Sequence, residues 1–403
     1  MSTLEAPIAL TIGVVILASL ALHRLARAFG QPPLVGDMCA GLLIGVVLNF
    51  IGKAFENTSS TLANSTAHSL VHLGEIGLIF LVVNALFHAP RGNTETSGGA
   101  SDSKAVLLIT LTNCVPPFLV GGWIALQYAS AHDLPASPAF LILIGVSMSI
   151  SAVPVLAGIL IELGLQSSRV GGLAFRAACW SDVIGWTLVG LALSLHQNAN
   201  SSNFIWTCLV LVITIFAILK TIKYLLVRHQ PGQTVTNQVI LIALLIAAGL
   251  TQLASLHVVF GAFLVGTVFA SNDTIRQGWL SATSWITDRF FCPLFFAIAG
   301  MKLLSSDEFA MSELGWGFAF LVVCVGTKLL PLYITGRWVG LSKPESQLLG
   351  LMLNTRGLME LVVLSVGLSS GIFSPLQYSI FVVVTAVTTL MSTPLCRLVQ
   401  RRL

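Results

Sequence analysis

Six ionisable side chains fall within otherwise apolar stretches of the sequence. An ionisable group in hydrocarbon costs about 2.5–3.5 kcal/mol on insertion scales, so each one is a candidate for binding or moving ions. These residues are Asp37, Glu75, Asp182, Lys328, Arg356 and Glu360. Asp182 lies about six residues into its apolar stretch, where a lone carboxylate can bind a cation or a proton but hardly both at once. We therefore expect Asp182 to be a shared cation and proton site.

The second candidate, Lys328, lies in the middle of an apolar stretch and is too deep to reach water easily. Asp182 is the obvious partner for its ammonium group. We expect a salt bridge between the two when no cation is bound, displaced when a cation arrives. A permanent structural ion pair that holds two helices together is the alternative.

Arg356 and Glu360 are four residues apart and therefore share one helix face. The Arg356 guanidinium can satisfy backbone carbonyls freed at a helix break or replace an ion there, and we favour the structural interpretation. Glu75 could join the ion path. Asp37 lies near the start of its stretch, where a satisfied interfacial carboxylate is the favoured interpretation.

His68 and His72 are spaced i, i+4, and with Glu75 they could suggest a metal site. They lie at the end of their stretch, where histidine is well tolerated. We therefore expect no resident metal and no cofactor.

The composition excludes most soluble classes of protein. Charged residues make up 9% of the 403 residues and hydrophobic residues 55%, whereas a soluble domain has about 25% charged residues. A cytosolic enzyme, a nucleic-acid-binding protein and a secreted disulfide scaffold are thereby excluded. The seven cysteines include no CxxC pair, which favours inert thiols.

Apolar runs of about 17–25 residues predict about thirteen transmembrane helices, so the expected fold class is an all-α polytopic membrane protein. We also expect residues 1–403 to form one transmembrane domain without a soluble regulatory domain. The predicted spans lie near 7–23, 33–52, 68–88, 104–128, 138–163, 173–194, 203–226, 237–253, 256–271, 286–304, 314–335, 346–369 and 375–396.

The Lys and Arg residues are distributed unevenly between the loops on the two sides. Of the 20 basic residues, sixteen fall on one side, Lys53 and Lys302 fall on the other, and Lys328 and Arg356 lie inside spans. Because positive loops stay in the cytoplasm, this bias predicts an external N-terminus and a cytoplasmic C-terminus in an inner or plasma membrane.

Two of the predicted spans are interrupted at corresponding places. The fifth span is broken at Ser147–Pro154 and the twelfth at Asn354–Gly357. The offset of seven spans is odd, so the second copy would be inverted across the membrane. Interrupted helices in inverted copies are typical of secondary transporters with a binding site near the midplane.

Three segments then carry a resemblance to a known family. Asn354–Leu364, Pro293–Lys302 and Val258–Gly266 resemble recurring segments of the monovalent cation:proton antiporter-2 family, and the similarity covers nearly the whole chain in order. The resemblance implies two units, one of them a core in which two broken helices cross. It also implies exchange of Na⁺, K⁺ or Li⁺ for H⁺ by alternating access, usually as a homodimer.

Within this resemblance, Asp182 matches the essential aspartate of the family, and Lys328 matches the basic residue of the span before the second broken helix. Ser149 and Ser151 fall at the first crossover. Ser181 stands where the family usually has Asp, Asn or Gln, so the ion-binding candidates are Asp182, Ser181, Ser149 and Ser151. Lys328, Arg356, Glu360 and Glu75 are the candidates for ion pairing or gating.

The main prediction is thus a cation/H⁺ antiporter that is not an enzyme. One alternative is a transporter of the same fold for an organic anion or a cation-loaded ionophore. The other is a non-transporting membrane sensor or assembly subunit, against which the charges at Asp182 and Lys328 argue.

Overall fold

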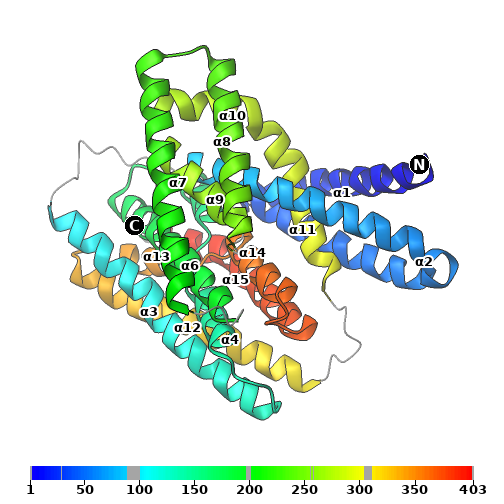
Figure 1. Ribbon diagram of the computed structural model, residues 1–403. Helices are drawn as coiled ribbons and strands as arrows, with labels where there is room; N and C mark the ends of the chain where they lie inside the picture. The colour runs from blue at the N-terminus through cyan, green and yellow to red at the C-terminus, as the bar shows by residue number, and fades with distance from the viewer. Residues whose placement is uncertain are drawn as a thin grey trace. The chain divides into compact units, whose positions relative to one another are not determined.

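The computed structural model describes residues 2–28, 30–88, 100–196, 201–254, 256, 258–303 and 311–401. Within these ranges the side chains at 2–8, 51–72, 75, 100–101, 201–205, 207–208 and 311–312 are not described. Every regular element in the described part is a helix, as the fold prediction requires (Figure 1). Among the described residues, ten helical stretches are long and apolar enough to cross a membrane.

The chain divides into two compact units, each of which is described separately. Unit 1 comprises residues 1–20, 40–88 and 193–301, and unit 2 comprises 21–39, 89–192 and 302–403. Three helices have residues in both units: α1 (Ser2–Ala28), α2 (Pro33–Phe87) and α6 (Arg169–His196). Unit 1 also contains α7 (Ser201–His229), α8 (Gln233–Leu253), α9 (Val258–Phe269), α10 (Asp273–Ile286), the π-helix η1 (Thr287–Phe291) and α11 (Cys292–Met301).

Unit 2 contains both interrupted spans. Its other helices are α3 (Ala100–Ala131), α4 (Pro138–Ser149), α5 (Val153–Glu162), α12 (Met311–Trp338), α13 (Lys343–Leu353), α14 (Leu358–Ser369) and α15 (Pro375–Gln400). The α4–α5 and α13–α14 pairs confirm the two predicted breaks.

Local sequence explains why each span breaks where it does. Residues Ile150 and Ala152 are extended, and Pro154 sits in the first turn of α5, where its missing N–H costs nothing. At the second break Gly357 adopts φ 157°, a conformation that side-chain-bearing residues rarely take.

The two breaks meet inside unit 2. The Ala152 backbone N–H donates to the Thr355 carbonyl at 2.9 Å, and the Ser151 hydroxyl donates to the Leu353 carbonyl at 2.5 Å. Extended backbone from one span thus hydrogen-bonds to the unwound backbone of the other. Such an arrangement satisfies backbone groups that lipid could not.

Helices α3 and α12 pack against each other and flank this meeting point (Figure 1). The Thr112 and Thr335 hydroxyls are hydrogen-bonded across them at 2.9 Å. From α3, Asn113 donates to Ser151, and the Cys114 carbonyl accepts from the Ser149 hydroxyl at 3.0 Å. The α3–α12 pair therefore holds the first break in place.

In unit 1, α2 and α11 approach closely through glycine. A Cβ at Gly45 would collide with the Ala297 carbonyl, and a Cβ at Gly300 would collide with the Leu42 carbonyl. The Gly41–Gly45 spacing is the small-residue pattern of closely packed membrane helices. Further along α2, the Asn84 side-chain oxygen accepts from the Trp279 indole of α10 at 2.8 Å.

The spans predicted at 33–52 and 68–88 both lie within α2, whose helical backbone is unbroken from Pro33 to Phe87. They remain two separate apolar stretches, Pro33–Phe50 and Ile76–Phe87. The chain folds back between them, because a Cβ at Gly45 would lie against Ala297 and a Cβ at Gly74 against Ile298, the next residue of α11.

One predicted boundary is wrong. The span predicted at 286–304 is preceded by helix α10 instead of a loop. Asn272 caps α10 by accepting from the Ile275 N–H, and the helix buries Trp279 on one face.

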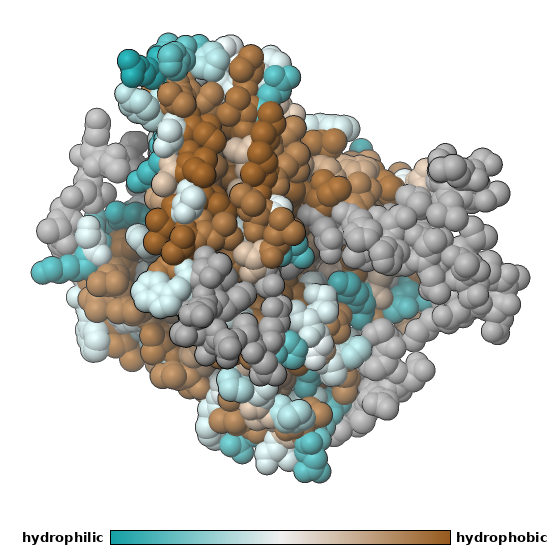
Figure 2. Space-filling model, viewed as in Figure 1, coloured by the Kyte–Doolittle hydropathy of each residue, from teal (hydrophilic) through white to brown (hydrophobic). Residues whose placement is uncertain are grey.

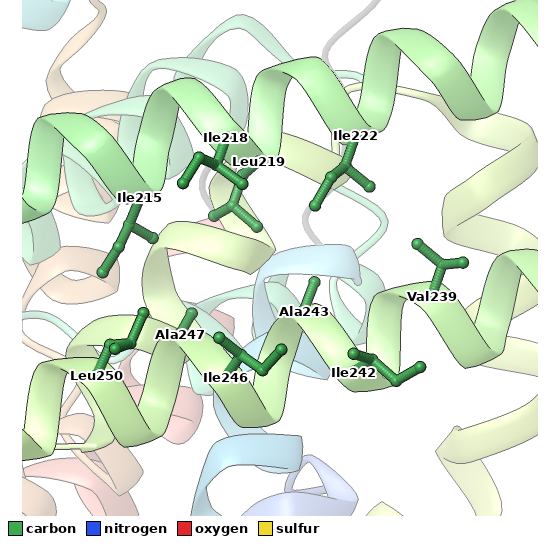
Figure 3. Close-up of a pocket in the computed structure, with 10 residues that line it drawn as sticks. All are labelled: Ile215, Ile218, Leu219, Ile222, Val239, Ile242, Ala243, Ile246, Ala247 and Leu250. Carbon is green, nitrogen blue, oxygen red and sulfur yellow. The ribbon is translucent and has the colours of Figure 1, made fainter.

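The α7 and α8 helices of unit 1 expose apolar side chains along their length, with polar residues at the turn that joins them (Figure 2). A groove of about 210 Å³ runs between them, lined only by aliphatic residues such as Ile218 and Ile246 (Figure 3). A surface of this kind is suited to contact with lipid chains, as the composition predicts.

Candidate functional site

Lys328 lies at the meeting point of the broken helices and is fully buried. Its ammonium group donates to the Ile150 carbonyl at 3.1 Å, the Ser151 hydroxyl at 2.8 Å and the Leu353 carbonyl at 3.0 Å. All three ammonium hydrogens therefore have acceptors. Two of these acceptors are backbone carbonyls at the C-terminal ends of α4 and α13, where a positive charge also interacts favourably with the helix dipoles.

Arg356 occupies the second break in a similar way. One guanidinium nitrogen donates to the Met148 carbonyl at 2.7 Å, and the other donates to the Ser147 carbonyl and to Glu360 Oε1, the latter at 2.9 Å. The Arg356 carbonyl accepts from the Thr389 hydroxyl at 2.7 Å. Arg356 thus satisfies carbonyls at the end of α4, which is the structural role that we favoured from the sequence.

Asp182 lies in the middle of α6 and is 1% exposed. Neither of its carboxylate oxygens has a hydrogen-bond partner among the described residues. One turn further along α6, a Cβ at Gly185 would lie 2.8 Å from the Ile150 side chain, so this part of α6 packs against the first break. A buried carboxylate without a partner is costly unless it binds a proton or a cation.

The predicted salt bridge between Asp182 and Lys328 is not formed in this structure. Lys328 donates to backbone carbonyls and to Ser151 instead. The physical reason is that helix ends at the two breaks offer fixed acceptors that reach the ammonium group directly. Asp182 and Lys328 still interact electrostatically, but no ion pair joins them.

Ser149 and Ser151 lie at the first break, and Ser181 precedes Asp182 on α6, each with different bonding. Ser151 accepts from Lys328 and donates to Leu353, whereas Ser149 donates to the Gly145 carbonyl at 2.7 Å and to Cys114. Ser181 donates to the Ala178 carbonyl of its own helix at 2.7 Å. The oxygen lone pairs of Ser149 and Ser181 thus remain open to a further donor or cation.

The remaining predicted residues divide into Asp37, whose side chain is described, and three whose side chains are not. Asp37 is buried and lies 3.3 Å from His23 Nδ1, which agrees with a satisfied carboxylate. The Glu75 side chain lies outside the described residues, as do those of His68 and His72.

Two groups at the crossing were missed from the sequence. Asn113 of α3 donates a hydrogen bond to Ser151. Helix α15 carries a row of buried hydroxyls, one of which, Thr389, donates to the Arg356 carbonyl at the second break. The row consists of Thr385, Thr388, Thr389, Ser392 and Thr393. Its i, i+3, i+4, i+7 spacing within an apolar helix was a visible signal.

Comparison with known proteins gives a consistent result. The family model described as transmembrane sodium/hydrogen exchanger matches residues 14–398. The chain is 31% identical over 385 residues to the Na(+)/H(+) antiporter NhaS4 of Synechocystis, covering 91% of this chain and 90% of the relative.

Longer relatives match as well. The chain is 29% identical to Cation/H(+) antiporter 17 of Arabidopsis thaliana and 26% identical to K(+)/H(+) antiporter 1 of Saccharomyces cerevisiae. It covers 47% and 43% of those two proteins, about half their length or less. The solved structure of the sodium proton antiporter MjNhaP1 from Methanocaldococcus jannaschii superposes with a TM-score of 0.66 at 14% identity, covering 97% of this chain and 96% of that one. This likeness shows a shared fold.

Proposed function

Because the chain belongs to the sodium/hydrogen exchanger family, we propose that it exchanges a monovalent cation, Na⁺, K⁺ or Li⁺, for H⁺ across a membrane by alternating access. The matching relatives are named as antiporters, so we propose transport and not catalysis. Residues 1–403 would act as one exchanger domain, since the family match spans 14–398.

The observation that carries this proposal is the Asp182 carboxylate. It is buried beside the meeting point of two broken helices, and no described residue donates a hydrogen bond to it. Either a proton or a monovalent cation can neutralise it, and the two cannot occupy it together. Competition for one carboxylate couples the two fluxes, because each cargo leaves only when the other can replace it.

The resident charges around Asp182 support the same role. Lys328 and Arg356 satisfy the carbonyls at the helix ends, so these carbonyls do not need the transported ion. Asp182, with the lone pairs of Ser149 and Ser181, is then the group that binds cargo. Lys328 and Arg356, paired with Glu360, hold the crossing together while the cargo changes.

The test is exchange by purified protein in proteoliposomes, measured with a pH-sensitive dye for each alkali chloride. Asp182→Asn keeps the size of the side chain but removes the charge, and we expect it to abolish exchange while folded protein is retained. Asp133→Asn is the matched control, because Asp133 is exposed and has φ 51°, a conformation that asparagine tolerates. Normal exchange by Asp182→Asn at matched protein levels would disprove the proposal.

We further propose an inner or plasma membrane location with the N-terminus outside and the C-terminus in the cytoplasm. The uneven distribution of Lys and Arg among the loops supports this orientation. Labelling of single cysteines introduced at Asp133 and Lys343 with a membrane-impermeant maleimide should modify the first in intact cells and the second only after permeabilisation.

The assembly we propose is a homodimer. The exposed apolar face of α7 and α8, which includes Ile213 and Ile242, offers a surface that a second copy or lipid can cover. Light scattering of the detergent-solubilised protein decides the point, and a protein mass of 42.8 kDa would exclude a stable dimer.

A further inference from the structure

A separate cluster of polar and aromatic side chains joins the end of α3 to the start of α12. Tyr128 and His132 come from α3 and the residue after it, and Glu313 and Trp316 come from α12. Glu313 is buried with 4% of its surface exposed, although it lies far from the crossing of the broken helices. It is fifteen residues before Lys328, which corresponds to roughly 22 Å along a helix.

Hydrogen bonds around His132 determine how many protons this cluster must hold. His132 Nδ1 lies 2.9 Å from the Tyr128 carbonyl, and a carbonyl can only accept, so Nδ1 carries a hydrogen. His132 Nε2 lies 2.8 Å from Glu313 Oε1. A neutral ring with its hydrogen on Nδ1 has only a lone pair at Nε2. An ionised carboxylate oxygen also has only lone pairs and no hydrogen to donate. This contact therefore requires a second proton between the two atoms.

From this geometry we propose that His132 and Glu313 form a second proton-binding site, separate from Asp182, that fastens α3 to α12 when it is occupied. With the proton present, the pair is an imidazolium–carboxylate bond or its neutral equivalent. Without the proton, two lone pairs face each other at 2.8 Å and the contact becomes repulsive.

The surroundings favour the protonated form. The Tyr128 hydroxyl donates to Glu313 Oε2 at 3.3 Å, and the Tyr128 ring stacks on the His132 ring with centroids 4.2 Å apart. An aromatic face stabilises a neighbouring cation. The hydrogen bond to the Tyr128 carbonyl and the Glu313 carboxylate raise the pKa of His132 above its ordinary value, and partial burial opposes them.

The neighbouring elements contribute mainly aromatic groups. The ring centroids of Trp316 on α12 and His132 are 6.1 Å apart. Phe320 of α12 packs against Phe381 of α15. Asp133, the next residue in the chain, is exposed. The groups that act on His132 are thus Glu313 and Tyr128.

Both helices that this site joins also contact the crossing. Helix α3 provides Asn113 and the Cys114 carbonyl to the first break, and α12 provides Lys328. Loss of the proton would loosen the α3–α12 pair at one end while the Thr112–Thr335 bond remains. A proton bound at this end therefore influences how firmly the pair supports the first break.

The pH dependence follows from the direction of the pKa shift. Because folding raises the pKa of His132, the stabilisation is fully present below the unfolded value of about 6.5 and is lost as pH rises through the higher folded value. The expected change therefore lies on the alkaline side of pH 6.5.

NMR titration of the full-length protein, labelled with ¹³C-histidine, measures the site directly. The His132 signal is the one missing from His132→Gln, and His196→Gln is the control, since it removes the signal of an exposed histidine at the end of α6. We expect a His132 pKa above 6.5 that falls towards 6.5 in Glu313→Gln. A value at or below 6.5 in the unsubstituted protein would overturn the proposal.

Thermal unfolding gives a second test that does not require Glu313→Gln to fold. The Tm of the unsubstituted protein and of His196→Gln should fall as pH rises above 6.5. The Tm of His132→Gln should not show this decrease. The same pH profile in all three proteins would contradict the proposal. Neither measurement depends on exchange, so its outcome is independent of the proposed transport function.

Discussion

Lys328 donates to the Ile150 and Leu353 carbonyls, and the Leu353 carbonyl also accepts from the Ser151 hydroxyl. Lys328→Met keeps the length of the side chain but removes the described donor of the buried Ile150 carbonyl, whereas Ser151 still donates to the Leu353 carbonyl. An unsatisfied buried acceptor costs about 1–3 kcal/mol, so we expect a loss of stability of about that size from the Ile150 carbonyl.

Thermal unfolding in detergent checks this expectation, with Lys343→Met as the control. Lys343 is exposed at the start of α13, where a surface substitution usually changes stability by no more than about 0.5 kcal/mol. Equal Tm values for the two variants would show that the Lys328 bonds contribute nothing to the fold.

The sequence located the chemistry at Asp182, Lys328, Arg356 and Glu360, but it did not predict the partner of Lys328. Side-chain charges are visible in a sequence, and the rule of pairing opposite charges pointed to Asp182. The acceptors that bind Lys328 are backbone carbonyls, which every residue carries. Only the three-dimensional meeting of the two helix ends shows which carbonyls are freed and where they point.

At the scale of elements, the contact between α2 and α11 depends on the absence of side chains. Gly45→Val would place methyl groups against the Ala297 carbonyl and the Met301 backbone, and overpacking of this kind costs about 1–3 kcal/mol. Gly249→Val in α8 is the matched control, because nothing lies within 4 Å of a Cβ at that position.

Measured Tm values should fall for Gly45→Val and change far less for Gly249→Val. A similar decrease in both variants would mean that the low helix propensity of valine causes it. The close approach of α2 and α11 would then not contribute to the stability of the protein.

Most of the helices and both breaks were predictable because hydropathy, proline and glycine act locally. The error at α10 has a clear cause. An amphipathic segment such as Asp273–Ile286 shows no long apolar window. Hydropathy measures burial in lipid and carries no information on helices outside it.

For the whole molecule, we expect electroneutral exchange. Ser181 cannot ionise, and the Lys328 ammonium is held by three oxygens, so Asp182 is the group near the crossing that releases a proton when a monovalent cation binds. Proteoliposomes clamped with valinomycin and K⁺ should exchange Na⁺ or Li⁺ at rates independent of the imposed potential. Rates that follow the potential would make Lys328 a second proton carrier.

The opposite result, exchange that depends on the membrane potential, is expected from one substitution. Ser181→Asp places a second carboxylate beside Asp182 and allows a second proton to move for each cation. Its exchange should then respond to the imposed potential, provided that the variant transports.

The resident charges at the crossing have an electrical consequence for this cycle. Lys328, Arg356, Glu360 and ionised Asp182 sum to zero, and either cargo changes the sum to one positive charge. If the crossing moves through the membrane field, it carries the same displacement charge outward and inward. A sudden step in Na⁺ or H⁺ concentration on a supported membrane should therefore give a transient current that decays to zero. A sustained current would contradict this expectation.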